Sequence, residues 1–347
     1  MLVALFLFSS LAWSRDDAPK DPLFASDDVL EATLTAPFST ITRLRSIEEE
    51  YAGTFRIGEK DYDVAVRSRG RFRREKDICD FPPIRLNFVK SQTKNTLLHG
   101  SDKVKLVTHC QDRSSRYEQT VVREYLAYRI LNVLTDASYG ARLLRITYVD
   151  SEGKQPDRVS FGVVIEHRDR LAKRLDRDYL EIDDTDIHSL DPEHTNIVSL
   201  FQYLIGNTDF SPIKATEGEP CCHNYVLFGA EGKPILSIPY DFDQSGIVDA
   251  PHAGPNPRFG LRSVRQRLYR GRCINNHLLP QTIDRFRSRR PEIEALINGV
   301  DGLSSKTRRN VLGYVDRFYK VIENPKAVNR SLTKVCLKSA PRQSSQK

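Results

Sequence analysis

Alternating hydrophobic and polar residues mark the first half of the chain as β-rich. Five short stretches show a two-residue alternation, at residues 30–36, 51–57, 62–67, 84–88 and 104–108. Such alternation is typical of strands that bury one face. Gly58-Glu59-Lys60 separates the second stretch from the third. A short break that contains glycine predicts a β-hairpin at this point.

One long helix interrupts these strands. Residues 117–134 carry apolar side chains at intervals of three and four positions, which predicts an amphipathic helix. Two more strands are predicted at 142–149 and 158–166, on either side of a turn at 150–153. Residues 28–166 are therefore expected to form a β-rich N-terminal lobe with one helix.

From residue 167 onward the pattern is mainly helical. Residues 194–206 have a clear apolar face, and two short strands follow at 225–228 and 234–239. Further helices are predicted at residues 262–269, 278–287, 290–297 and 304–322. Residues 167–338 are expected to form a mainly helical C-terminal lobe that holds a β-hairpin. Together the two halves predict an α+β fold of two lobes.

The N-terminus looks like a cleaved export signal. Residues 2–11 form an apolar run that is too short to anchor a protein stably in a bilayer. Ala12 and Ser14 fit the small positions of a signal-peptidase site, although no Lys or Arg precedes the run. We interpret residues 1–14 as a signal peptide, with a buried N-terminal strand or helix as the alternative. Residues 15–27 are expected to be a flexible leader.

The remainder of the chain supports an exported protein. No later stretch approaches ~18 apolar residues, so no stable membrane anchor is expected. We predict a periplasmic or secreted location. The polar residues 339–347 are expected to be a disordered tail.

Six cysteines point in the same direction: Cys79, Cys110, Cys221, Cys222, Cys273 and Cys336. An even number in an exported chain predicts disulfides, and the absence of a CxxC pair argues against a zinc ribbon. The adjacent Cys221 and Cys222 cannot easily bond to each other, so each is expected to reach another cysteine. Six cysteines allow 15 connectivities and the sequence does not choose among them; we favour Cys79–Cys110 and Cys222–Cys273. The alternative is six buried, reduced thiols.

The net charge of +7 comes from 53 basic and 46 acidic residues and is mild for 347 residues. Basic residues gather at 67–74 and 262–272. Such clusters suit phosphate-bearing ligands, or are simply solvated basic faces. No nucleic-acid-binding motif accompanies them, so no nucleic acid partner is expected.

The candidate chemistry lies between residues 206 and 246. Asp209 follows a predicted helix, Asn224 begins a strand, and Asp241 and Asp243 follow the next strand. These positions place the side chains at one end of a β-hairpin. Phosphoryl transfer needs a carboxylate for the acceptor hydroxyl and oxygen ligands for a metal. Oxygen ligands favour Mg²⁺ or Mn²⁺ over zinc, while the alternative is ordinary turn and helix-capping chemistry.

Other chemistries find less support. The chain has no GxSxG nucleophile elbow, which argues against a serine hydrolase. The acidic residues 182–186 lack the spacing and glycine of an EF-hand loop and are expected to be a solvated loop or helix cap. Of the histidines beside notable residues, His223 is expected to line the site and His109 to be structural.

The motifs of this segment resemble those of a known family. Gly206-Asn207-Thr208-Asp209, His223-Asn224 and Tyr240-Asp241-Phe242-Asp243 are similar to the catalytic-loop and metal-loop motifs of CotH-type and HipA-type atypical kinases. Upstream, Arg69-Gly70-Arg71 and residues 84–88 resemble early strands of the CotH group. The resemblance spans about residues 60–250 and is most specific at 206–246.

This resemblance implies a two-lobed protein-kinase-like fold that uses ATP and Mg²⁺. It makes Asp209 the catalytic base and Asn224 a metal ligand. Asp241 becomes the main metal ligand, with Asp243 as the second choice.

For the nucleotide, the resemblance implies Lys105 as the phosphate-binding lysine, with Lys103 as its rival. Glu124 would pair with the lysine, and residues 163–166, ending in Glu166, would form the hinge that faces adenine. The chain departs from the kinase pattern because it has no GxGxxG loop, for which Arg69 and its neighbours are the candidate substitute. Lys105 and Glu124 also have an alternative interpretation as plain surface residues.

The leading hypothesis is therefore an exported ATP- and Mg²⁺-dependent kinase-like phosphotransferase. Its acceptor would be a protein hydroxyl or a small molecule. One alternative is a pseudokinase that binds without transfer, and another is a metal-dependent phosphohydrolase.

Overall fold

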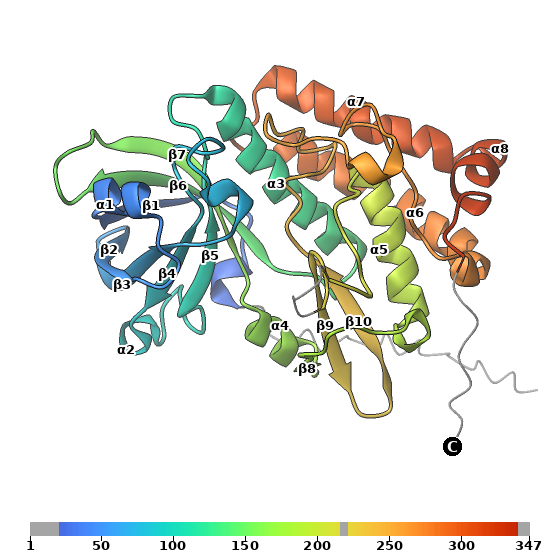
Figure 1. Ribbon diagram of the computed structural model, residues 1–347, viewed down its shortest axis with the longest axis horizontal. Helices are drawn as coiled ribbons and strands as arrows, with labels where there is room; N and C mark the ends of the chain where they lie inside the picture. The colour runs from blue at the N-terminus through green and yellow to red at the C-terminus, as the bar shows by residue number, and fades with distance from the viewer. Residues whose placement is uncertain (1–20, 216–220, 339–347) are drawn as a thin grey trace, which may run out of the picture.

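The structure is a computed structural model that describes residues 21–215 and 221–338 (Figure 1). The predicted signal peptide at 1–14, the first part of the leader and the predicted tail at 339–347 lie outside the described residues. Within the described part, no helix is long and apolar enough to cross a membrane.

Seven strands form a closed barrel in the order β1-β2-β3-β4-β5-β7-β6. Their bounds are β1 Leu30–Ala36, β2 Tyr51–Ile57, β3 Lys60–Ser68, β4 Ile84–Phe88, β5 Lys103–Val107, β6 Ala141–Asp150 and β7 Arg158–Ile165. Neighbouring strands are antiparallel except for β1 and β6, whose parallel pairing closes the barrel. All seven strands lie where the alternation predicts them.

The barrel interior explains why the alternation predicts these strands well. Leu34, Val66, Leu86, Leu106 and Ile146 belong to one apolar cluster inside the barrel, and each is 0% exposed. Full burial of such a side chain contributes about 1.5–3 kcal/mol. Side chains alternate between the two faces of a strand, so the polar partners of these residues lie on the outside.

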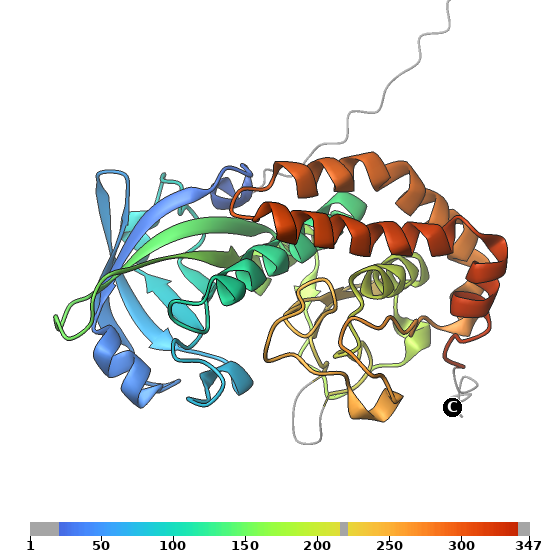
Figure 2. The same ribbon diagram turned by 90° about the horizontal axis from the view of Figure 1, so that it is seen from above.

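Helix α3 (Ser115–Leu134) lies between the barrel and the rest of the molecule (Figures 1 and 2). It packs against β6 and β7 on one side and against α5 (Pro192–Ile205) and α6 (Leu279–Gly299) on the other. It is therefore buried over most of its circumference and belongs to the second, larger apolar core.

The remaining elements follow β7 in the chain. They are α4 Arg168–Arg174, β8 Asp178–Tyr179, β9 Tyr225–Ala230, β10 Lys233–Pro239, α7 Ser305–Ile322 and α8 Pro325–Val328. The strands form a second sheet in the order β10-β9-β8. Figure 2 shows α6 and α7 running side by side over this half of the molecule.

The prediction of a two-lobed, protein-kinase-like fold with one helix in its β-rich half is wrong. The strands close into a mixed barrel because β1 pairs with β6 as well as with β2. The same half also contains the short helices α1 (Phe38–Leu44) and α2 (Lys90–Thr93). Alternation identifies the buried face of a strand but not its pairing partners, so barrel closure is invisible to it.

Two details of the second half also differ from the prediction. Residues 262–269 form no helix, and the helices predicted at 278–287 and 290–297 are one continuous α6 with Pro291 inside it. Pro291 removes one backbone donor, but the apolar face of α6 continues through it, with Ile283, Phe286, Ile293 and Ile297 buried. Packing of this face outweighs the local cost of the proline.

All six cysteines form disulfides, so the alternative of reduced thiols is wrong. The predicted Cys79–Cys110 bond is confirmed. The predicted Cys222–Cys273 bond is wrong, and so is the expectation that the adjacent cysteines do not pair, since Cys221 bonds to Cys222 and Cys273 bonds to Cys336. Cys273 meets Cys336 because its own N–H donates to the carbonyl of Leu337 (3.0 Å), which draws the C-terminal segment alongside.

Removing the Cys273–Cys336 bond is expected to lower the stability of the whole fold. The bond closes a loop across a separation of 63 residues, and α6 and α7 lie within that loop. A double Cys273→Ser, Cys336→Ser variant should lose about 2–4 kcal/mol of unfolding free energy. Urea unfolding of variant and wild type under non-reducing conditions measures this difference, and identical midpoints would contradict the prediction.

Candidate functional site

Asp209 is placed by the end of α5. The helix begins at the capping residue Asp191 and ends at Gly206, whose φ of 67° is the left-handed conformation that glycine adopts without strain. The side chain of Asn207 then accepts the N–H of Asp209 at 2.9 Å. The chain therefore turns sharply after α5 and presents Asp209 at the start of a loop.

Both carboxylate oxygens of Asp209 are hydrogen-bonded. Oδ1 lies 2.9 Å from Nε2 of His223, and Oδ2 accepts Nδ2–H of Asn224 at 3.1 Å. Nδ2 of Asn224 also donates to the main-chain oxygen of Asp209 at 2.7 Å. The hydrogen bond and charge of Asp209 raise the pKa of His223. Asp209 is 37% exposed and His223 39%, so this group is fixed in place and still open to solvent.

Arg270 holds the loop of Asp209 from the other side. Its Nη1 donates to the carbonyls of Thr208 (3.0 Å) and Phe210 (2.6 Å), which flank Asp209. Its guanidinium lies over the rings of Phe210 and Phe259, at 4.4 and 4.8 Å from their centroids. This member of the basic cluster at 262–272 therefore serves the main chain rather than a phosphate. The sequence did not point to Arg270, because no local pattern indicates which distant main-chain carbonyls an arginine contacts.

The acidic turn lies next to Asn224. Strands β9 and β10 pair Tyr225 with Pro239, and the N–H of Tyr240 donates to the carbonyl of Asn224 at 3.0 Å. Asn224 and Asp241 both have positive φ, 56° and 61°. Non-glycine residues adopt this conformation rarely, and it is enriched at functional sites.

Burial and like charge shape the acids of the turn. Burial and the nearby charge of Asp243 raise the pKa of Asp241 to about 6, against the opposing charges of Arg69, Arg73 and Lys105. Burial alone would also raise the pKa of Asp243, but a hydrogen bond from His252 and the charge of Arg73 bring it below its usual value. Of the two acids, Asp241 is therefore the one whose ionised form is disfavoured by its surroundings.

Cations from the barrel face this turn. Lys105 on β5 is half-buried, and burial together with the charge of Arg69 lowers its pKa to about 8. Its Nζ lies 4.7 Å from the ring centroid of Tyr240, beside Asp241. Its cross-strand neighbour is Arg85 on β4.

Apart from the ring of Tyr240 under Lys105 and the charge of Asp241, these cations have few partners of their own. In the part of the chain that the structure describes, the side chains of Lys105 and Arg85 make no hydrogen bond or ion pair, and Nε of Arg69 is buried without a partner. Buried charges are normally paired. The excess positive charge therefore forms a surface suited to an anionic ligand.

Two predicted site residues are engaged elsewhere. The carboxylate of Glu124 lies 3.7 Å from Arg73, not beside Lys105, and burial raises its pKa to about 8. The carboxylate of Glu166 accepts from Arg174 and from the N–H of Gly140, both at 2.9 Å. Glu166 is only 4% exposed, so this side chain serves an internal ion pair.

The oxygen atoms near the turn fit a magnesium ion only in part. Because Asn224 donates through Nδ2, its Oδ1 is left over, and the carboxylate of Asp241 accepts no hydrogen bond from the described residues. Across residues 21–215 and 221–338, no three His, Cys, Asp or Glu side chains are grouped to hold a metal. Mg²⁺ commonly binds one or two protein oxygens and completes its shell with water and phosphate, and this donor set suits that arrangement.

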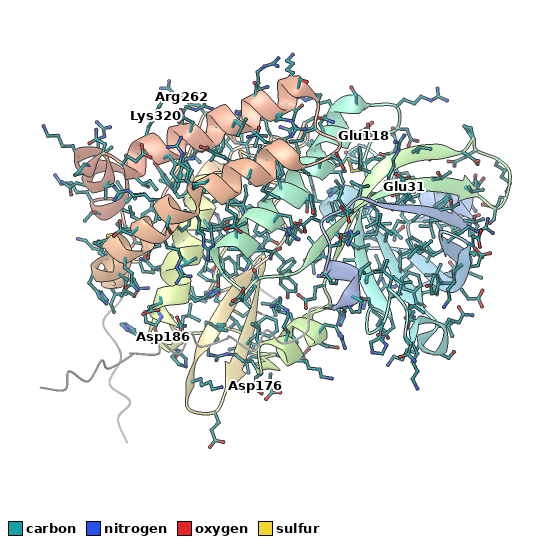
Figure 3. The ribbon with its side chains drawn as sticks, turned by 180° about the vertical axis from the view of Figure 1, so that it is seen from behind. Glu31, Glu118, Asp176, Asp186, Arg262 and Lys320 are labelled. Carbon is teal, nitrogen blue, oxygen red and sulfur yellow. A yellow bond between two sulfur atoms is a disulfide. The ribbon has the colours of Figure 1, made fainter. Side chains whose placement is uncertain are left out.

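Figure 3 shows charged side chains of both signs projecting from the barrel, from α3 and from the helices. The labelled Arg262 and Lys320 are examples of the basic side chains, and Glu118 and Glu31 of the acidic ones. Unlike the exposed Arg262 and Lys320, Lys105 is half-buried.

Comparisons with known proteins add no identification: no protein-family profile matches the chain, and no curated protein matches it. The similarity to CotH-type kinases therefore rests on the motif residues alone.

Proposed function

We propose that this protein is an exported, ATP- and Mg²⁺-dependent phosphotransferase of the CotH type that acts on the hydroxyl of a protein or a small molecule. One observation carries the proposal. A fixed, solvent-accessible carboxylate, Asp209, adjoins an acidic turn at Asp241, and unpaired cations at Lys105 and Arg69 face that turn. Phosphoryl transfer requires these three kinds of group.

Each group has a role in the proposed reaction. The acceptor oxygen bonds to the γ-phosphorus as the bond from phosphorus to the bridging oxygen breaks, and the acceptor proton moves to Asp209. Each carboxylate oxygen of Asp209 keeps a second lone pair for this proton. Lys105 and Arg69 offset the charge of the phosphates. Asn224 and Asp241 would hold Mg²⁺, which would offset the negative charge of the phosphates.

Transfer to water is the second candidate. Asp209 and His223 are both more than one-third exposed, so a water molecule reaches them as readily as a hydroxyl does. This openness favours a phosphohydrolase if the acceptor does not exclude water. Phosphate release without added acceptor separates the two activities, and nucleotide binding with neither activity would identify a pseudokinase.

Export is supported by the cysteines. Three disulfides in a chain of this size are typical of oxidising compartments. We therefore place the proposed activity in the periplasm or outside the cell.

The nucleotide half of the proposal is tested at Lys105. Replacing it with Met removes the half-buried cation that faces the acidic turn, and we expect Mg-ATP to bind about 10–100-fold more weakly, as befits one charge-assisted bond to phosphate. Isothermal titration calorimetry measures the affinity.

Lys103→Met is the matched control, because Lys103 lies on the same strand and face but is exposed. Equal affinities of the two variants would remove Lys105 from the site. If the wild type binds no nucleotide with Mg²⁺ or Mn²⁺, the proposed function is wrong.

A further inference from the structure

Tyr128 on α3 touches the acidic turn from the buried side. Its hydroxyl oxygen accepts the N–H of Asp241 at 2.9 Å. Its ring lies 4.7 Å from the ring of Phe242, the next residue in the turn, and Tyr128 is only 1% exposed. Helix and turn are therefore joined by a directional bond and by ring packing at adjacent positions.

The conformation of Asp241 needs such support. Its φ of 61° is left-handed, and an L-residue keeps this conformation only where its surroundings impose it. The preceding residue, Tyr240, is held by the carbonyl of Asn224. Among the described residues, Tyr128 provides the one side chain that hydrogen-bonds to the main chain of residues 240–243. Its hydrogen bond is made to Asp241, the residue of this turn that has the left-handed backbone conformation.

Aromatic side chains lie beside the N–H of Asp241 on its buried side. Tyr128, Phe242 and Phe201 form a contiguous aromatic group around it, with Phe201 5.4 Å from Phe242. A buried N–H that loses its acceptor in such surroundings carries the full cost of desolvation, so the turn would shift to find another partner. A shift of the turn would also displace the carboxylate of Asp241.

We propose that Tyr128 is a positioning residue that holds the carboxylate of Asp241 where it shares a metal ion with Asn224; this inference rests on the proposed function of the site. Tyr128 does not touch the ligand itself. It acts through the main chain of Asp241, which makes α3 part of the support of the site.

Tyr128→Phe tests the bond without removing the ring. Tyr125→Phe is the matched control, because Tyr125 lies on the same helix, is equally buried at 1% and makes no hydrogen bond to the turn. In Tyr128→Phe we expect the Mn²⁺ concentration for half-maximal binding of a non-hydrolysable ATP analogue to rise about 10-fold, as for the loss of a ligand's supporting partner. Binding of the analogue without metal should stay unchanged.

A second readout keeps the test independent of nucleotide binding. Hydrogen exchange at residues 240–243 should accelerate in Tyr128→Phe and not in Tyr125→Phe, because the N–H of Asp241 loses its acceptor. Equal exchange and equal Mn²⁺ dependence in the two variants would overturn the inference. If the wild type binds no nucleotide, the proposed function fails, and hydrogen exchange alone decides whether Tyr128 holds the turn.

Discussion

Asp209→Asn is expected to abolish phosphoryl transfer while leaving nucleotide binding intact. Asparagine keeps the size of the side chain and an oxygen that accepts from Asn224 or His223, but it cannot take a proton from an acceptor hydroxyl. Loss of general-base catalysis typically lowers kcat by about 10²–10⁴-fold. The affinity for Mg-ATP should change little, because in the proposed reaction Asp209 serves the acceptor, whereas Lys105 and Arg69 serve the phosphates.

The measurement compares transfer rates and calorimetric affinities of Asp209→Asn, wild type and a control. Asp183→Asn is a suitable control, since Asp183 is exposed and makes no side-chain hydrogen bond within the described residues. An unchanged rate in Asp209→Asn would refute the assignment of the base. If the affinity for Mg-ATP is lost while the stability is unchanged, Asp209 would instead contribute to binding the nucleotide or the metal.

Asp241→Asn is expected to have two opposite effects. Nucleotide binding should lose its dependence on Mg²⁺, because the variant lacks the proposed main carboxylate ligand. The free protein, in contrast, should become more stable at pH 7. Burial and the charge of Asp243 raise the pKa of Asp241 to about 6, so the ionised carboxylate disfavours the folded state.

The sign follows from linkage. A carboxyl group whose pKa is higher in the folded than in the unfolded state destabilises the fold as the pH rises from its ordinary value of 3.8 through about 6. At pH 7 the full penalty is present, and a neutral asparagine removes it. Each unit of pKa shift corresponds to about 1.4 kcal/mol, so we expect a gain of about 1–3 kcal/mol in the free energy of unfolding at pH 7. At pH 4 most of this gain should be lost.

Asp176→Asn provides the control for this variant. Asp176 has the same left-handed conformation, with φ 52°, but its side chain is 96% exposed and projects outward in Figure 3. The control should change neither stability nor metal dependence. Urea unfolding at pH 4 and pH 7, with titrations of Mg-ATP, gives both quantities. A destabilised Asp241→Asn would mean that attraction to Arg69 and Lys105 outweighs the burial of the charge.

The opposing effects at Asp241 illustrate a common compromise. At Asp241 the turn has an acid, although a neutral side chain would make the free protein more stable. The nearby Arg69 likewise has a buried Nε without a hydrogen-bond partner. Groups that are poorly satisfied in the free protein are the groups that a charged ligand can satisfy. This compromise distinguishes the segment from an ordinary capped turn.

Local patterns in the sequence were sufficient for most individual elements. The alternation at 30–36 coincides with β1, and the helical spacing at 304–322 nearly coincides with α7 (Ser305–Ile322). The same reasoning placed Asp209 and Asn224 at adjoining positions, because a helix end and the start of a hairpin are features of local sequence. Each of these depends on residues within a few positions of one another.

Long-range packing decided everything else. The β1–β6 pairing that closes the barrel joins strands more than 100 residues apart, as does the bond from Asp241 to Tyr128, with a separation of 113. Arg270 reaches the loop of Asp209 across 62 residues, and Cys273 finds Cys336 across 63. Hydrophobic periodicity specifies which face of an element is buried, not which element covers it. The sequence by itself therefore determined most of the strands and helices, whereas only the tertiary structure determined the barrel, two of the three disulfides and the side chains that hold the candidate acids in place.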